Sequence, residues 1–244
     1  MKTRVIRHAG GFIFRPAKIE EADEIAILEK SVWGDSAANS SQIKSRIETF
    51  SVGNYVAEYE GRVVAFCSYE YVDDSVFSGG FTWEEITDHG FIIKSHKPSG
   101  RYGYGINLSV HHSMNGKRLG DRMSLFGLIN IIDTGRSGSF IGSRIPGFAS
   151  YKKNNPDFKV EDYVSLKRNG KLRDYELRLY GNVGFKPIKV LPNYFPDPES
   201  LNYGVLVHRG NIFKYFPLRR LIGKAVWFLV NRMIDKEIKK SIKK

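Results

Sequence analysis

The stretch that most constrains this chain is SVHHSMNGKRLGDRM, residues 109–123. An apolar, β-prone run ends at Val110, a turn rich in glycine and positive charge follows, and an amphipathic helix begins near Leu119. The first N–H groups of a helix have no intrahelical partner, so this arrangement directs several amides and a helix N-terminus at one point. Such a point attracts phosphate, and the sequence therefore predicts an anion-binding turn.

The composition is that of a folded protein from a reducing compartment. The chain has 244 residues, of which 41% are apolar, enough for a sizeable core. Its single cysteine, Cys67, lies in the apolar run VVAFCSY, which excludes a disulfide framework and indicates a core residue. The charged start MKTRVIRHAGG is not followed by the apolar segment of a signal peptide. We therefore expect a cytoplasmic protein.

The net charge of +12 is concentrated at one end of the chain. Residues 211–244 carry ten Lys or Arg and two acidic residues, whereas residues 1–210 carry 28 and 24. Nucleic-acid-binding domains usually carry a basic face on the folded domain itself. This distribution disfavours nucleic acid as a partner.

Apolar periodicity predicts the order of the elements along the chain. Strands are predicted at 11–17, in both halves of YVAEYEGRVVAFCSYEYV, at 104–112, and in GSFIGSRI, KPIKVLP and LNYGVLVHR. Helices are predicted in IEEADEIAILEKSVW and SSQIKSRIETF, from about Leu119 to Asp133, and in LRDYELRLYGNVGF. This order predicts a mixed α/β (α+β) fold, with a mostly antiparallel central sheet flanked by helices.

Two stretches, about 73–103 and about 147–170, have no sustained period and are predicted to be insertions. The first contains the aromatic residues Phe77, Phe81 and Trp83, and its position suits a lid over a site.

Two separated stretches resemble the GNAT superfamily of acyl-CoA N-acyltransferases. LSVHHSMNGKRLGDRM resembles the family's strand, pyrophosphate loop and helix, in which the loop reads Gln/Arg-x-x-Gly-x-Gly/Ala. Asn115 stands at the first position of this loop, Arg118 replaces the first Gly, and Gly120 matches the last.

The second stretch, ELRLYGNVGFKPI, is similar to a later helix and turn in which a Tyr precedes a Gly-Phe pair, here Tyr180, Gly184 and Phe185. The resemblance covers about residues 11–208. It implies a GNAT-like domain at 1–210 that carries both insertions.

The resemblance implies transfer of an acetyl or longer acyl group from acetyl-CoA or another acyl-CoA to a small-molecule or peptide amine, by direct attack and without a metal. The amide of Val110 is expected to polarise the thioester carbonyl, and Tyr180 to protonate the departing thiolate. Lys117, Arg118 and Arg122 are expected to add positive charge at the pyrophosphate. The expected contacts with CoA are Ser109, Val110, Asn115, Gly116, Lys117, Arg118, Leu119, Gly120 and Asp121.

The general base and the acceptor contacts are left open. Candidate bases are Glu70, Glu84, Asp88, His111 and His112. A chain of water molecules would make a dedicated base unnecessary. Asp197 and Glu199, beside Ser200, are candidate contacts for a cationic amine, and an ordinary turn is the alternative for this stretch.

Residues 211–244 are predicted to form a basic amphipathic helix that is too short and too charged to span a bilayer. Three interpretations stay open. The helix packs on the domain; it lies on an anionic membrane, at the inner face, through Trp227, Phe228 and flanking Lys and Arg; or it docks an acidic acyl carrier protein, which then supplies the acyl group. A catalytically silent GNAT-fold binding module is the alternative to an enzyme, and the departures at Asn115 and Arg118 favour it.

Overall fold

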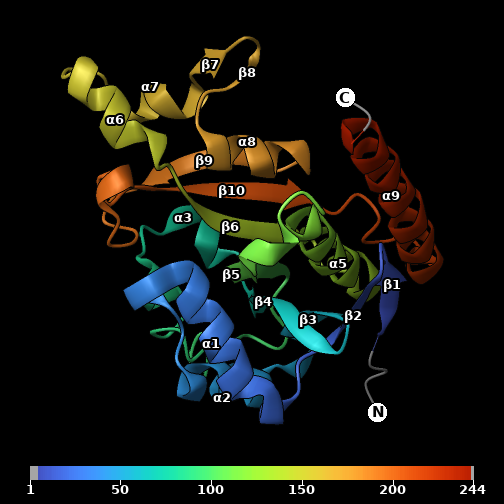
Figure 1. Ribbon diagram of the computed structural model, residues 1–244. Coiled ribbons are helices and arrows are strands. Elements are labelled where there is room, and N and C mark those ends of the chain that lie inside the picture. The colour runs from blue at the N-terminus through green and yellow to red at the C-terminus, as the bar shows by residue number, and fades with distance from the viewer. Residues whose placement is uncertain (1–4, 243–244) are drawn as a thin grey trace.

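The architecture is a twisted sheet of eight strands with helices on both faces (Figure 1), as a computed structural model describes it for residues 5–242. The predicted segments 1–210 and 211–244 therefore include six residues, 1–4 and 243–244, that lie outside the described residues. In spatial order the strands are β1 (Arg7–Ala9), β2 (Phe12–Pro16), β3 (Asn54–Tyr59), β4 (Arg62–Val72), β5 (Tyr102–Val110), β6 (Gly138–Arg144), β10 (Gly204–Gly210) and β9 (Lys186–Leu191).

Neighbouring strands are antiparallel except for β5 and β6, which run parallel. The predicted mixed α/β fold with a mostly antiparallel sheet is confirmed. The sequence did not reveal β1, which forms a hairpin with β2 through two glycines of positive φ, Gly10 and Gly11. A strand of three residues is too short to show a period of two.

Helices cover both faces of the sheet. On one face, α1 and α2 bury Ile25, Ile43 and neighbouring apolar residues against Phe66 of β4. On the other face, α5 packs Met123 and Phe126 against β2 to β5. The helices are α1 (Ala22–Trp33), α2 (Ser40–Thr49), α3 (Ser75–Ser78), α4 (Trp83–Ile86), α5 (Leu119–Thr134), α6 (Gly147–Asn154), α7 (Val160–Ser165), α8 (Tyr175–Asn182) and α9 (Arg219–Ile242). Short 3₁₀ turns lie at Ile19–Glu21, Gly34–Ser36, Ser51–Gly53, His112–Met114 and Pro198–Ser200.

Both predicted insertions are packed segments with short helices. The first contains α3 and α4 and contributes Val76, together with partly buried aromatic side chains, to a core on β5, β6 and β10. Its Trp83 Nε1 donates a hydrogen bond of 3.2 Å to the carbonyl of Ile106 on β5. The second contains α6 and α7, which bury Phe148 and Tyr163 against the opposite face, and leads into the hairpin of β7 (Lys167–Arg168) and β8 (Lys171–Leu172).

The last helix, α9, lies against α5 at the edge of the molecule (Figure 1). Its inner face buries Trp227, Asn231 and Ile234. The ring of Trp227 meets that of Phe14 at 5.0 Å, and its Nε1 donates to the carbonyl of His8. Of the three interpretations of this segment, packing on the domain is therefore confirmed for the inner face. Among the described residues, no helix is both long enough and apolar enough to cross a bilayer.

Candidate active site

A cleft opens in the middle of the sheet, where its two parallel strands separate. β5 and β6 pair only from Tyr102 to Gly105 on one side and from Gly138 to Ile141 on the other. Beyond these residues β5 follows β4, while β6 follows β10. The two strands therefore diverge, and the facing edge of β5 is free to bind a ligand.

The free edge of β5 presents backbone amides to the cleft. The N–H of His111 donates to the carbonyl of Val64 on β4. Because N–H direction alternates along a strand, the amides of Val110 and Leu108 point away from β4 and into the cleft. Val110 was predicted from the sequence and Leu108 was not, although the same alternation identifies both residues.

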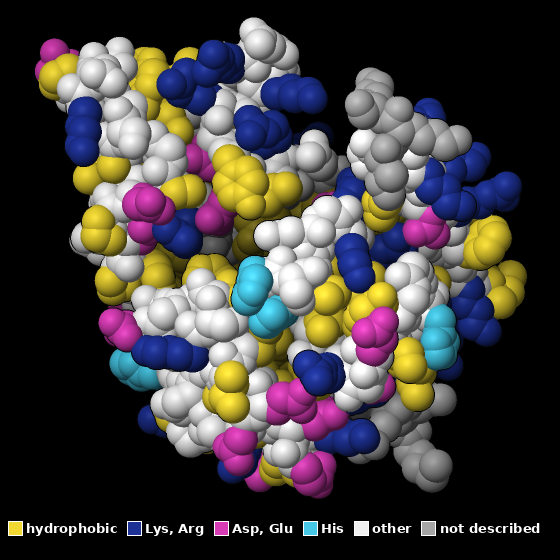
Figure 2. Space-filling model, in the orientation of Figure 1, with side chains coloured by type: hydrophobic (Ala, Val, Ile, Leu, Met, Phe, Trp, Pro, Cys, Tyr) yellow, Lys and Arg dark blue, Asp and Glu magenta, His cyan; other side chains and the backbone are white. Residues whose placement is uncertain are grey.

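The cleft has a volume of about 540 Å³ and is walled mainly by apolar side chains. In Figure 2 it shows as a hollow with hydrophobic walls between α8 and the start of α5. Five of the predicted site residues line it: Val110, Arg118, Gly120, Asp121 and Tyr180.

The turn before α5 has the unpaired amides that the sequence predicted. Within the described residues, no hydrogen bond is made by the amides of Gly116, Arg118, Leu119, Gly120 and Asp121. Gly116 and Arg118 both have positive φ, +79° and +51°. Arg118 thus adopts the left-handed conformation that glycine adopts without strain, at a cost of about 1–2 kcal/mol.

The cations of this turn are already engaged within the protein. The guanidinium of Arg118 pairs with Asp121 and with Glu237 of α9. Arg122 is 1% exposed and points away, toward Asn231 and Asp235 of α9. The expectation that Arg122 adds charge at a pyrophosphate is therefore wrong.

The other predicted CoA contacts, Ser109, Asn115, Gly116, Lys117 and Leu119, are not among the residues that line the cleft. The Nζ of Lys117 lies 4.0 Å from the ring centre of Tyr59. Asn115 and Gly116 are exposed, and Leu119 is a core residue.

Ser109 is fully buried and faces α1. Its Oγ donates to the carboxylate of Glu29 and accepts from Trp33 Nε1 at 2.8 Å. The alternation along the strand explains this placement. Ser109 is next to Val110, so its side chain points to the opposite face of the sheet and its backbone amide points toward β4.

The wall of the cleft opposite β5 is α8, which carries two groups suited to proton transfer. Burial raises the pKa of Tyr180 far above its usual value, so the phenol stays protonated. Burial raises the pKa of Glu176 to about 7, although Arg144, whose Nη1 lies 3.9 Å from the carboxylate, opposes the shift. Glu176 was not among the predicted site residues. Its position four residues before Tyr180, which places both on one helix face, is the signal in the sequence that points to it.

The five candidate bases from the sequence lie outside the cleft lining. Glu70 is fully buried, its pKa is raised to about 8 by burial, and it accepts a hydrogen bond from Ser95. The imidazole rings of His111 and His112 lie 4.2 Å apart, centre to centre, and are tilted by 34° to each other. The carboxylate of Glu84 lies 3.8 Å from His89 Nδ1, and Asp88 accepts a hydrogen bond from the amide of Lys94.

The acidic residues before β10 are occupied by an arginine. Arg144 donates to both carboxylate oxygens of Asp197, at 2.8 and 3.0 Å, and also to Glu199. Asp197 accepts from Ser200 as well and is 5% exposed. The carboxylates are thus used in hydrogen bonds within the protein, which agrees with the alternative that this stretch is an ordinary turn.

Cys67 lines the cleft, but burial raises the pKa of its thiol to about 12, which disfavours the nucleophilic thiolate. Across residues 5–242, the structure has no group of three or more His, Cys, Asp or Glu side chains arranged to hold a metal ion.

One curated relative is the uncharacterized N-acetyltransferase YkwB of Bacillus subtilis. It is 32% identical over 177 residues, which cover 72% of this chain and 76% of that protein. The chain belongs to the GNAT superfamily. A separate comparison with models of protein families gives no match.

A second curated relative of this GNAT chain is much longer. The probable hydrolase YhcX of Bacillus subtilis is 27% identical over 223 residues, which cover 88% of this chain and 42% of that protein. The chain thus spans less than half the length of YhcX.

Solved structures confirm the GNAT fold. The loading GNATL domain of CurA from Lyngbya majuscula has a TM-score of 0.69 at 24% identity, with 82% of this chain and 97% of that domain covered. The GphF GNAT-like decarboxylase in complex with isobutyryl-CoA has a TM-score of 0.69 at 22% identity, with 81% and 98% covered.

Proposed function

We propose that this protein transfers an acyl group from acyl-CoA to an amine, by direct attack within the cleft between β5 and β6. One observation carries the proposal: the inward amides of Leu108 and Val110 lie on the strand that leads into the turn with unpaired amides at Gly116 and at 118–121. A pantetheine arm needs such an edge, and a pyrophosphate needs such a turn. The GphF decarboxylase, a structural neighbour, holds an acyl-CoA.

The proposed chemistry uses three groups of the cleft. The amide of Val110 donates to the thioester carbonyl and stabilises the oxyanion that forms as the amine nitrogen attacks. As the C–S bond breaks, the phenol of Tyr180 protonates the departing thiolate. The carboxylate of Glu176 accepts the proton lost by the amine, a task for which a pKa of about 7 is well matched.

Gly120 provides the direct test of this proposal. A Cβ at this position would lie 4.0 Å from Val110 Cγ2, so the fold has room for a side chain there, and that side chain would enter the cleft. Calorimetric titration with acetyl-CoA and a long-chain acyl-CoA is expected to show micromolar binding that Gly120→Leu abolishes. Absence of binding by the folded wild type to either donor would reject CoA as the carrier, and a carrier-protein donor or a silent module would then be favoured.

A docking surface on α9 is proposed as the peripheral contact of this enzyme. Its solvent face exposes Leu221, Phe228, Leu229 and Met233, and Leu218 is exposed just before the helix, each between 57% and 62%. Figure 2 shows hydrophobic side chains protruding among Lys and Arg along this edge. The two acidic side chains of α9 are turned to α5, where Asp235 pairs with Arg122 and Glu237 with Arg118.

The outer face of α9 is therefore apolar and basic, which matches the surface of an anionic membrane. Co-sedimentation with phosphatidylglycerol vesicles is expected to exceed that with phosphatidylcholine vesicles and to fall with salt. The double variant Phe228→Ser/Leu229→Ser should lose binding, whereas Ile27→Ser, a 73% exposed control on α1, should keep it. Equal sedimentation of all forms, or self-association that the double variant abolishes, would reject the membrane.

A further inference from the structure

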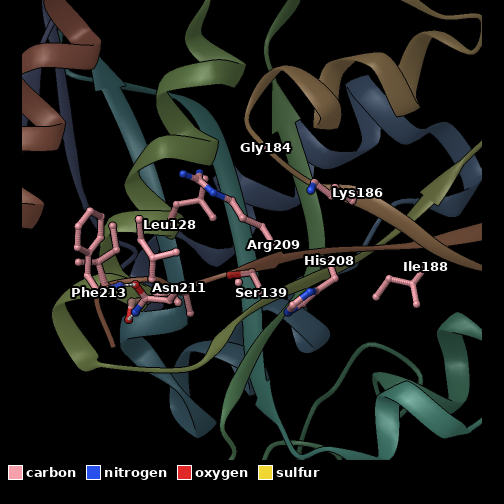
Figure 3. Close-up of a pocket in the computed structure, with 13 residues that line it drawn as sticks. Leu128, Ser139, Gly184, Lys186, Ile188, His208, Arg209, Asn211 and Phe213 are labelled. Carbon is pink, nitrogen blue, oxygen red and sulfur yellow. Dashed lines mark hydrogen bonds between the residues drawn. The ribbon is translucent and has the colours of Figure 1, made fainter. Parts of the chain in front are cut away.

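A second cavity of about 500 Å³ lies behind the cleft, between α5, β6, β10 and the start of β9 (Figure 3). Its walls include Leu128, Ile131 and Ile132 of α5 and Ile188 of β9, with Phe213 at one end. This volume falls in the range of small-molecule sites.

The charge inside this cavity is positive and unbalanced. Arg209 and Lys186 line it, and none of its lining residues is acidic. The backbone of Arg209 pairs with Ser139 of β6, but within the described residues its side chain makes no hydrogen bond and no ion pair. Burial alone lowers its pKa, because no carboxylate lies near enough to oppose the shift. The guanidinium is only partly buried and has no protein partner, so an anion inside the cavity would gain a charge-assisted hydrogen bond from it.

The local structure makes room for the guanidinium. Figure 3 shows the side chain of Arg209 extending across the cavity toward Leu128. Gly184, in the turn before β9, has a φ of +87°, and a Cβ there would lie 3.3 Å from Arg209 Nε. A residue with a side chain at this turn would be strained and would crowd the cation.

We propose that this cavity binds a carboxylate attached to a medium-length hydrocarbon chain, with Arg209 as its counter-ion. The charge of Arg209 selects the anion, and Leu128, Ile131 and Ile132 cover the hydrocarbon. The proposal does not depend on acyl transfer.

The carboxylate can come from two sources, because the cavity and the cleft share three wall residues, Leu128, Ile131 and Ser139. One source is a free fatty acid. The other is the far end of an acyl-CoA whose acyl group carries a terminal carboxylate.

Calorimetry on the full chain with octanoate, and with octanol as the neutral analogue, tests the anion. Wild type is expected to bind octanoate, and Arg209→Gln to weaken it about tenfold to a hundredfold, the usual effect of losing a charged hydrogen-bond partner. Arg209→Lys should restore part of the affinity. Arg62→Gln removes an exposed arginine of β4 and should change nothing.

A second titration distinguishes the sources. It compares octanoyl-CoA with the CoA monothioester of the eight-carbon dicarboxylic acid, whose free end is a carboxylate. If Arg209→Gln weakens only octanoate, the ligand is a separate acid; if it weakens the carboxylated thioester and spares octanoyl-CoA, the ligand is the donor's own tail. If Arg209→Gln is folded and affects neither carboxylate, or if wild type binds neither, the proposal is overturned.

Discussion

Glu176 and Tyr180 lie one helical turn apart on α8, and both side chains line the cleft between β5 and β6. Burial raises the pKa of both groups, but with different results at neutral pH. The phenol is held fully protonated, whereas the carboxyl titrates near pH 7. One helix face thus presents an acid and a base to the same space, and in our proposal each has its own step.

Tyr180→Phe removes the acid and keeps the ring that packs against Phe185. We expect kcat to fall about a hundredfold or more, with little change in the KM of the donor, because a general acid acts chiefly in the transition state. Release of free thiol measures the rate. A donor with a more acidic leaving thiol should recover much of it, and a loss that this donor leaves unchanged would contradict the acid role.

Glu176 should give the reaction a pH profile. With a pKa of about 7, the base is protonated and inactive below that value, so kcat should rise tenfold per pH unit up to about 7 and then level off. An acceptor amine whose own pKa lies below about 5 keeps the substrate from titrating in this range. Glu176→Gln should lower the plateau and remove the inflection. An unchanged inflection would assign it to another group.

The same carboxyl should affect the free energy of unfolding with a definite sign. Between its unfolded pKa, about 4.3, and the native value of about 7, the native state binds more protons than the unfolded state. The contribution of Glu176 to stability is therefore present at low pH and lost as pH rises through 7. Urea titrations should show a smaller loss over this interval in Glu176→Gln, and an equal loss would mean that the native pKa is not raised.

Glu237 links α9 to the turn before α5 through its pair with Arg118. Replacing it with Gln removes a negative charge beside the proposed pyrophosphate site and releases the guanidinium. We expect the Kd of CoA to fall about twofold to fivefold at low ionic strength, with the difference shrinking as salt screens the charges. Glu161→Gln, at an exposed acid on α7, is the control. Unchanged or weaker binding would show that Arg118 does not face the phosphates.

The contrast between α8 and α5 shows what the sequence can reveal. Apolar period and turn residues predicted the main strands and helices, and the loop motif located Gly120 and Val110, since these features are local. Glu176 was missed because its pKa depends on burial by distant segments and on Arg144 of β6. The pairing of Arg118 with Glu237 joins residues 119 positions apart, which no local pattern encodes.

The adjacent residues Trp227 and Phe228 separate the two faces of α9. Trp227 is 7% exposed and packs on Phe14 and Phe126, whereas Phe228 is 62% exposed. Trp227→Ala should lower the free energy of unfolding by about 3–5 kcal/mol, while Phe228→Ala should change it by less than about 0.5 kcal/mol. Chemical denaturation of the full chain measures both. If Trp227→Ala were as mild as Phe228→Ala, α9 would not be packed on the domain in solution, and the pairing of Glu237 with Arg118 would lose its structural support.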